Sequence, residues 1–359
     1  MRVVFRTDAS TKTGSGHVMR CLTLANALKQ LGAHISFICA PLPGNQIDRI
    51  RKAGFTVTSL HESESDSNQT RAILTDKMPD WLIVDHYLLD ASWEHNQRQN
   101  CGSIMVIDDL ADRKHDCDLL LDQTYLRLSD DYRLRVPGHC NILTGTHYAL
   151  LRAEFALHRE ISLNRRLKRS PKTQPLGQIL ITFGGTDPSN MTGRILKTLS
   201  TYPSLPENCK LLVVMGNQAP YIKHVMEITH DFPYPVDIVV NVTNMAELMT
   251  QSDLCICAAG STSWEAACLG IPTMMTRIAD NQHLTLQTLS DEKLVLKLDP
   301  LNIGHSLTTQ LDIIIKDSGT LLPLLSSRFS HVCDGLGAKR VAKYLLKSEQ
   351  SKHSGSSND

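Results

Sequence analysis

Residues 3–31 read VVFRTDASTKTGSGHVMRCLTLANALKQL and contain a strand pattern, a loop and a helix pattern in succession. Val3-Val4-Phe5 is a short, uncharged run rich in β-branched residues, which is typical of a buried parallel strand. After the loop, apolar residues recur at helical spacing, namely Val18, Cys21, Leu22, Ala25, Leu28 and Leu31. We therefore expect His17 to open a helix directly after a glycine-bearing loop.

A strand, a glycine loop and a helix N-terminus together form a place where backbone N–H groups can receive an anion. Sugar nucleotides and dinucleotides are the candidate ligands. A dinucleotide site needs a third glycine at position 19, where Met19 stands, and an acidic residue after the second strand. That strand, 35–38, is followed by Cys39-Ala40-Pro41. The sequence thus lacks both features of a nicotinamide dinucleotide site. The question that remains is what His17 does at the end of the glycine loop.

The composition limits the choice of partners. A chain of 359 residues predicts two domains, and 37 basic residues against 37 acidic ones give no field that would attract nucleic acid or an anionic membrane. None of the ten cysteines forms a C-x-x-C pair, which favours buried free thiols in a reducing compartment. Met1-Arg2 leads straight into a strand, and no apolar run reaches the roughly 18 residues of a membrane span. We expect a cytoplasmic protein without membrane insertion.

Three strands of the first half end in acidic residues. The segments 81–87, 103–109 and 119–123 each run from apolar residues into Asp, and the first also delivers Tyr87. Any one of these Asp residues can be a helix cap or a turn residue. Together they predict a shared edge at the carboxyl ends of a parallel sheet, where such sheets bind ligands. The polar segment 61–70 shows no periodicity, and we interpret it as the start of a surface connection.

The second half repeats the βα pattern. Strand 178–183 is followed by Gly184-Gly185, and strand 236–240 by Asn241-Val242. Strand 254–258 leads into Gly260-Ser261-Thr262, which presents amides and hydroxyls suited to phosphate. Glu265 follows in the first turns of the next helix, where it can accept hydrogen bonds from a ribose diol or serve the helix dipole. Asn281 and Gln282 are amides that can bind sugar hydroxyls.

These patterns predict an α/β protein of two doubly wound domains. We expect a first domain at 1–156, a linker at 157–176, a second domain at 177–332, a C-terminal helix within 333–348 and a disordered tail at 349–359. The linker contains the basic run 162–174, which we interpret as a solvated connector between domains in preference to a membrane patch.

Several segments resemble one known family. The N-terminal segment reads Arg6-x-Asp8-Ala9-Ser10-x5-Gly16-His17-Val18-Met19-Arg20-Cys21-Leu22-x-Leu24-Ala25. Further matching segments follow in order at 84–87, 107–111, 148–155, 183–188 and 259–265. They are similar to the UDP-2,4-diacetamido-2,4,6-trideoxy-β-L-altropyranose hydrolase family (PseG) of pseudaminic acid biosynthesis, within the MurG-like GT-B superfamily. The resemblance implies two Rossmann-like domains that face one another across a cleft.

The resemblance also implies an activity and a set of site residues. The reaction is hydrolysis of a UDP-sugar with inversion at the anomeric carbon, in which His17 is the general base and Tyr87 lies beside it. The expected sugar contacts are Asp8, Ser15, Gly16, Arg20, Asn281 and Gln282. The expected UDP contacts are Gly184, Gly185, Asn241, Val242, Gly260, Ser261, Thr262 and Glu265. No metal or cofactor is expected.

The residues agree with this chemistry, because UDP leaves without needing a proton and one base is enough to activate water. They leave open whether Asp8 or another carboxylate orients His17. Two other functions fit the same patterns: a GT-B glycosyltransferase that passes the sugar to an alcohol, and a UDP-sugar-binding module without catalysis. We expect a monomer, and the residues do not decide which stereoisomer of the sugar is accepted.

Overall fold

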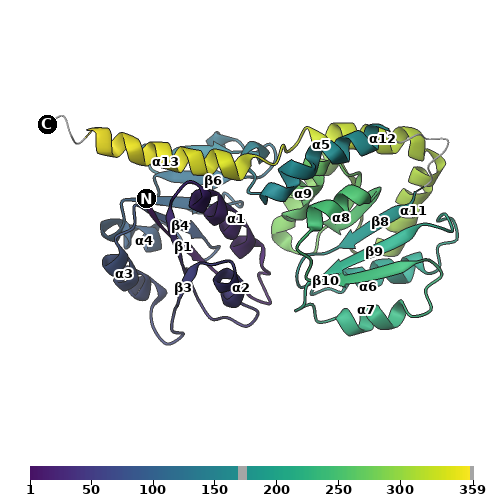
Figure 1. Cartoon of the computed structure of the whole chain (residues 1–359), viewed down its shortest axis with the longest axis horizontal. Coiled ribbons are helices and arrows are strands. Elements are labelled where there is room, and N and C mark those ends of the chain that lie inside the picture. Colours follow the sequence, from purple (N-terminus) through teal and green to yellow (C-terminus); the bar gives the residue numbers. More distant parts are fainter. Residues whose placement is uncertain (169–175, 356–359) are drawn as a thin grey trace. The chain divides into compact units, whose positions relative to one another are not determined.

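A computed structural model describes residues 1–168 and 176–355 of the chain. The chain divides into two compact units (Figure 1). The first unit comprises Met1–Leu151 together with the C-terminal segment from Leu336, and the second comprises Arg152–Gly335. Each unit is a parallel sheet covered by helices, which confirms the prediction of two doubly wound Rossmann-like domains.

The first unit contains a seven-stranded parallel sheet in the order β3-β2-β1-β4-β5-β6-β7. Its strands are β1 (Arg2–Thr7), β2 (His34–Cys39), β3 (Thr56–Ser59), β4 (Trp81–Asp85), β5 (Ser103–Ile107), β6 (Leu119–Asp122) and β7 (Asn141–Thr144). Every residue of β4, β5 and β6 is buried, as expected of strands covered on both faces. The strand order reverses between β1 and β4, so residues that follow these two strands meet at the switch point where such sheets bind ligands.

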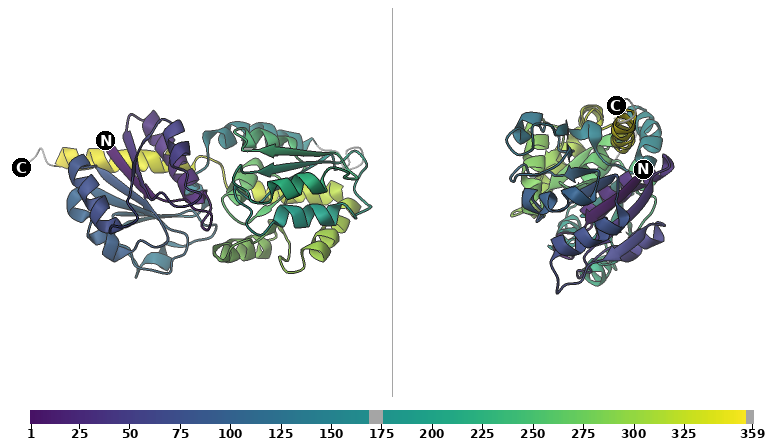
Figure 2. Two further views of the ribbon diagram at one scale, coloured as in Figure 1. Left: turned by 90° about the horizontal axis from the view of Figure 1, so that it is seen from below. Right: turned by 90° about the vertical axis from the view of Figure 1, so that its left-hand side faces the viewer.

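The helices of the first unit are α1 (Gly16–Gln30), α2 (Ile47–Lys52), α3 (Asp66–Lys77), α4 (Ala91–His95) and α13 (Gly337–Gly355), with short 3₁₀ turns at η1 (Arg98–Asn100), η2 (Ser129–Tyr132) and η3 (Thr146–Tyr148). The C-terminal helix α13 lies along α1 in the first unit, as the yellow ribbon shows in both figures (Figures 1 and 2). Its buried stripe of Ala338, Val341, Ala342 and Leu345 joins the core that contains Leu28. The tail predicted from 349 is wrong as far as Gly355, because α13 continues to that residue; 356–359 lie outside the described residues.

The second unit contains a six-stranded parallel sheet in the order β10-β9-β8-β11-β12-β13. Its strands are β8 (Gln178–Thr182), β9 (Lys210–Met215), β10 (Val236–Val240), β11 (Leu254–Ala258), β12 (Thr273–Thr276) and β13 (Leu296–Lys297). Its helices are α5 (Ala153–Leu167), α6 (Met191–Leu199), α7 (Ile222–Ile228), α8 (Met245–Gln251), α9 (Thr262–Leu269), α10 (His283–Asp291), α11 (Ile303–Lys316) and α12 (Ser318–Ser330), with a 3₁₀ turn at η4 (Asp280–Gln282). Here the order reverses between β8 and β11.

The predicted linker at 157–176 is wrong for its first part, because residues up to Leu167 belong to helix α5 of the second unit. Arg166 is buried and donates to the carbonyl oxygens of Met249, Ser252 and Leu269 at 3.0–3.2 Å. These carbonyls end helices α8 and α9, where backbone acceptors have no partner within the helix. In the described part of the basic run, Arg166 therefore caps the C-terminal ends of helices α8 and α9. Residues 169–175 of the predicted linker lie outside the described residues.

Replacing Arg166 tests this assignment. Arg166→Met keeps the apolar stem but removes the guanidinium that donates to three carbonyl oxygens at the ends of α8 and α9. These oxygens keep a second donor each, from Ser162, Arg165 or the Ser252 N–H, so we expect the free energy of unfolding of the second unit to fall by about 1–2 kcal/mol. The matched control Lys168→Met, at an exposed position of the same segment, should change it by less than about 0.5 kcal/mol. Hydrogen exchange of the α8 and α9 amides in the full chain measures the effect. Equal protection in the two variants would contradict the capping role.

Candidate active site

The loop that leads to His17 is a closed turn. The Gly14 N–H donates to the Ser10 carbonyl oxygen at 2.8 Å, and the Ser10 hydroxyl oxygen accepts from the Thr13 N–H at 3.1 Å. Gly14 has a φ of +73°, in the left-handed region that a side chain would strain. Helix α1 then begins at Gly16 with no side-chain hydrogen bond from Ser15 at its N-cap. His17 thus lies in the first turn of the helix, as predicted.

His17 is held by a carboxylate from the neighbouring strand. Its Nδ1 lies 2.5 Å from Oδ1 of Asp85, the last residue of β4, and both side chains are buried. The Tyr87 ring meets the imidazole edge-on, with 4.4 Å between ring centroids and 89° between planes. A carboxylate at Nδ1 selects the neutral tautomer that carries its hydrogen there. Nε2 is therefore the nitrogen that can accept a proton, and the predicted pair of His17 and Tyr87 comes together in the structure.

Asp85 is kept ionised by Arg20. Nε and Nη2 of Arg20 donate to the two oxygens of Asp85, each at 2.7 Å. Burial by itself would raise the pKa of Asp85, but the charge of Arg20, followed by that of His17 and their hydrogen bonds, lowers this pKa well below its usual range. Nη1 of Arg20 donates to Asp109 at 2.9 Å. Arg20, predicted as a sugar contact, is thus engaged with two carboxylates of the chain itself.

A second pair of imidazole and carboxylate involves Asp8. His86 Nε2 lies 3.2 Å from Oδ2 of Asp8, while His86 Nδ1 accepts the backbone N–H of Leu88 at 3.1 Å. Both ring nitrogens of His86 are therefore engaged, which leaves it no lone pair for a proton from water. In this respect the geometry separates the two pairs, because of the two rings the His17 imidazole is the one that has a nitrogen left to accept a proton. It also answers the question that the sequence left open, because Asp85 orients His17 and Asp8 orients His86.

Asp8 is tied to a buried arginine. Nη1 and Nη2 of Arg6 donate to its two oxygens at 2.7 and 2.8 Å, and the Ala40 N–H donates to Oδ1 at 2.7 Å. Burial raises the pKa of Asp8, but the hydrogen bond with His86, followed by the hydrogen bonds and charge of Arg6 and the Ala40 N–H, lowers this pKa well below its usual range. Arg6 also pairs with Asp66, the first residue of α3. The prediction of a surface connection over 61–70 is wrong from Asp66 onward, because this contact anchors the start of a helix.

In the second unit, the predicted UDP turns both lie at the switch point of the sheet. Gly184 and Gly185 follow β8, whereas Gly260 and Ser261 follow β11, and these two strands are neighbours. Helix α9 begins at Thr262 with no side-chain cap from Ser261. A Cβ at Gly216 would overlap the carbonyl oxygen of Gly185, so the loop after β8 lies directly against the loop after β9. The N–H groups of Ser263 and Trp264 donate to the carbonyl oxygens of Gly260 and Ser261, so the preceding amides, those of Ser261 and Thr262, are the ones that can meet an anion.

Glu265, on the first turn of α9, is partly buried beside Arg152. Nη2 of Arg152 donates to Oε1 of Glu265 at 3.4 Å, and Nη1 of the same guanidinium lies 2.9 Å from Glu154. Burial raises the pKa of Glu265, and the charge and hydrogen bond of Arg152 only partly offset it. A carboxylate in this state is a strong acceptor that titrates at a higher pH than an ordinary glutamate.

The remaining predicted contacts of the second unit are spread over two loops. Gln282, in η4, approaches Gly260, because a Cβ on that glycine would lie 3.7 Å from its Nε2. Asn281 precedes it in the same turn. Asn241 and Val242 follow β10, and the Asn241 N–H donates to the Met215 carbonyl oxygen at 2.9 Å. The structure thus brings Gln282 to the Gly260 turn, whereas Asn241 and Val242 follow a different strand.

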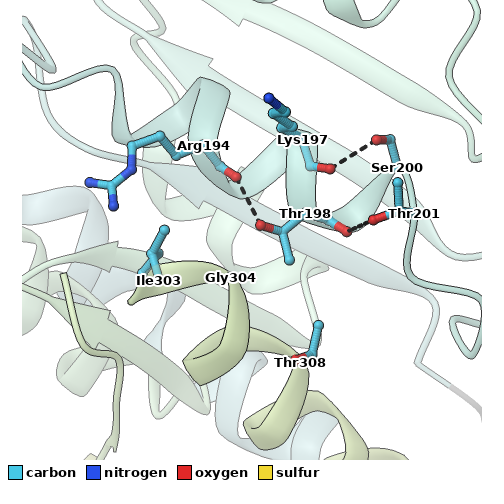
Figure 3. Close-up of a pocket in the computed structure, with 8 residues that line it drawn as sticks. All are labelled: Arg194, Lys197, Thr198, Ser200, Thr201, Ile303, Gly304 and Thr308. Atoms are coloured by element: carbon cyan, nitrogen blue, oxygen red, sulfur yellow. Dashed lines mark hydrogen bonds between the residues drawn. The ribbon is translucent and has the colours of Figure 1, made fainter. Parts of the chain in front are cut away.

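A cavity of about 620 Å³ lies elsewhere in the second unit, between α6 and α11 (Figure 3). The hydroxyls of Thr198, Ser200 and Thr201 on its wall donate to carbonyl oxygens of their own segment at 2.9–3.2 Å. None of the predicted contacts lines it.

Among the described residues, no group of three or more His, Cys, Asp or Glu is arranged to hold a metal ion. No helix in the same part of the chain is both long and apolar enough to cross a membrane.

Sequence reasoning missed four residues of these sites. Asp85, Asp109, Arg6 and Arg152 make the ion pairs described above, and none was predicted as a contact. Asp85 and Asp109 stood at strand ends that were predicted to share an edge, which was the available signal. For Arg6 and Arg152 the sequence offered no signal beyond their presence in segments that resemble the family.

The fold places the chain in a known structural class. Two Rossmann-like domains of this kind define the GT-B fold. MurG of Acinetobacter baumannii superposes over 96% of this chain and 99% of its own with a TM-score of 0.70 and 14% identity. The predicted fold class is therefore confirmed. No family model matches the chain.

Two curated relatives add a sequence comparison. The UDP-2,4-diacetamido-2,4,6-trideoxy-beta-L-altropyranose hydrolase of Campylobacter jejuni is 29% identical over 290 residues, which are 81% of this chain and 96% of that protein. The resemblance predicted from the motifs is thus confirmed. An uncharacterized protein of Methanocaldococcus jannaschii is 28% identical over 310 residues, 85% of this chain, and the match spans 61% of the length of that relative.

The geometry predicts opposite tautomers for two neighbouring histidines. Neutral His17 should carry its hydrogen on Nδ1, which faces Asp85, whereas neutral His86 should carry it on Nε2, which faces Asp8. Two-bond ¹H–¹⁵N correlations of protein labelled with ¹⁵N-histidine distinguish the two forms. The signals are assigned with His17→Gln and His86→Gln, and a His17 ring protonated on Nε2 would contradict the assignment of the base.

Proposed function

We propose that the chain hydrolyses a UDP-sugar at the anomeric carbon with inversion, and that the sugar is of the 2,4-diacetamido-2,4,6-trideoxy-β-L-altropyranose type. The single observation that carries the proposal is the contact between Nδ1 of His17 and the ionised carboxylate of Asp85, from which we infer that Nε2 is the nitrogen that accepts a proton. The activity for which the Campylobacter jejuni relative is named supports the substrate class. The pathway expected from that resemblance is pseudaminic acid biosynthesis.

In the proposed reaction, His17 Nε2 accepts a proton from water while the water oxygen forms a bond to the anomeric carbon. The bond from that carbon to the diphosphate oxygen breaks, and its electron pair leaves with UDP. Attack opposite the leaving group inverts the configuration. Tyr87, edge-on to the imidazole, limits the orientations of the ring. The proton on His17 then passes to solvent, and the free sugar departs.

We assign UDP to the turns at the switch point of the second unit. The backbone amides of Ser261 and Thr262 and the dipole of α9 stabilise the diphosphate, so that UDP departs without a proton from a general acid. Glu265 accepts the ribose hydroxyls. The turn at Gly184 and Gly185, which follows the adjacent strand, completes the proposed diphosphate contact.

Because all ten cysteines are free thiols, we place the enzyme in the reducing cytoplasm.

A panel of UDP-sugars tests the activity. The wild-type chain, incubated without an acceptor, should release UDP from the diacetamido sugar, and NMR should show the inverted free sugar as the product. His17→Ala should lower kcat by roughly 10²–10⁴, the usual contribution of a general base, with UDP affinity retained within a few-fold. The control His34→Ala, an exposed imidazole of the same unit, should retain full activity.

Two outcomes of this panel would overturn the proposal. UDP release that requires an added alcohol acceptor would indicate a glycosyltransferase. UDP-sugar binding without turnover, unchanged in His17→Ala, would indicate a binding module.

The state of Glu265 predicts a pH dependence of binding. The ionised carboxylate accepts the ribose hydroxyls, and its pKa is raised, so affinity should be full above this pKa and should fall as the pH drops through it. Calorimetry with UDP-N-acetylglucosamine, whose diphosphate diester does not titrate between pH 5 and 8, should show a loss of roughly five-fold, the difference between a charged and a neutral acceptor. Glu265→Gln should remove this dependence. Parallel pH curves for the two proteins would contradict the assignment.

A further inference from the structure

Arg20 lies between two carboxylates that close neighbouring strands. Its Nε and Nη2 donate to Asp85, and its Nη1 donates to Asp109 Oδ2 at 2.9 Å. Asp85 ends β4 and Asp109 follows the end of β5, and these strands are paired in the sheet. His17 and Arg20 are three residues apart on α1, so both side chains face this edge. Nη2 of Arg20 also lies 3.3 Å from Nδ1 of His17, so the four groups form one connected cluster, in which Asp109 is linked to the imidazole through Arg20.

The surroundings hold Asp109 in place. Its carbonyl oxygen accepts Nη2 of Arg127 at 3.0 Å, and Nε of the same Arg127 donates to Asp122 Oδ2 at 2.5 Å. Asp122 is the last residue of β6, which is buried. The loop after β5 is therefore fixed to the end of the next strand through its backbone. Of the carboxylate oxygens of Asp109, Oδ2 accepts from Arg20, and Oδ1 is buried without a hydrogen-bond partner among the described residues.

We propose that Asp109 is a positioning residue for His17, and that it acts through Arg20 and Asp85. By holding Nη1 of Arg20, Asp109 sets the plane of the guanidinium. The fork of Nε and Nη2 then fixes both oxygens of Asp85, and Oδ1 of Asp85 holds the Nδ1 hydrogen of His17. This assignment gives Arg20 a role within the chain in place of the predicted contact with the sugar.

The alternative role for Arg20, a direct contact with the sugar, would require a different orientation of its guanidinium. A sugar-binding arginine directs its fork at the ligand, whereas here the fork of Nε and Nη2 is used by Asp85. Arg20 is also buried, at 8% exposure. The positive charge of Arg20 offsets the negative charge of Asp85 at close range. The main effect of Asp85 on the imidazole is therefore to orient the ring, and the effect of its negative charge is smaller. The kinetic part of this inference rests on the proposed hydrolysis, whereas the part that concerns the tautomer of His17 does not.

The test removes the acceptor and then restores it. Asp109→Ala should lower kcat by about 10- to 100-fold, the usual effect of losing a group that orients a catalytic side chain, with KM within about twofold. Asp109→Asn keeps an oxygen for Nη1 and should retain kcat within about threefold of wild type. Asp130→Asn, in an exposed pair with Arg133, is the matched control and should change neither constant.

A measurement without substrate runs in parallel. In ¹⁵N-histidine spectra of the full chain, Asp109→Ala should reduce the fraction of neutral His17 with its hydrogen on Nδ1, and Asp109→Asn should restore it. Arg20→Lys should behave like Asp109→Ala, because one ammonium group does not reproduce the planar fork. Arg20→Lys also loses the fork to Asp85, so it tests the link from Arg20 to His17, whereas Asp109→Ala tests the link from Asp109 to Arg20. Asp109→Ser, whose hydroxyl is too short to replace the carboxylate, takes the place of Asp109→Ala if that variant fails to fold.

The outcomes separate the two proposals. A wild-type His17 spectrum in a folded Asp109→Ala variant would overturn the positioning role, whatever the spectrum of Arg20→Lys. A rise in KM with unchanged kcat would also overturn it, and would return Arg20 to the sugar. If the wild-type chain hydrolyses no UDP-sugar while these variants still shift the His17 tautomer, the proposed function fails and the positioning role stands.

Discussion

The ionised carboxylate of Asp85 is the contact on which the rest of the candidate site depends. It lies fully buried at the end of β4, and it is compensated by the Arg20 fork and by the Nδ1 hydrogen of His17. A buried charge persists only when it is paired and hydrogen-bonded, so the removal of either partner leaves Asp85 uncompensated. The orientation of the imidazole therefore follows from the way in which the protein satisfies one buried carboxylate.

The same physical constraint shapes both units. The central parallel strands of each sheet, such as β4 and β11, are buried on both faces, so polar groups occur where these strands and the helices end. In the first unit these ends supply His17 and its carboxylate, and in the second they supply the turns after β8 and β11. The arginines of α5 follow this rule as well, because they satisfy the terminal carbonyls of the helices they contact. Each unit thus combines an apolar sheet with a polar edge at its switch point.

Much of the fold could be predicted because its signals are local. Apolar runs identified the strands, and the loop before His17 identified the start of α1. Contacts between distant positions gave no such signal: Asp85 is 68 residues from His17, and Asp8 was an equally reasonable partner. The basic segment before 168 was misinterpreted because composition does not reveal which helix ends a side chain meets. Helix α3 was missed because Asp66, its first residue, is held by Arg6 and by the Trp93 indole N–H.

The central claim is that water, activated by His17, attacks the anomeric carbon of a UDP-sugar. Carrying out the reaction in ¹⁸O-labelled water and analysing both products by mass spectrometry tests it most directly. We expect one ¹⁸O atom in the free sugar and none in UDP, with the rate of incorporation lowered in His17→Ala as kcat is. Label in the diphosphate of UDP would mean attack at phosphorus and would contradict it.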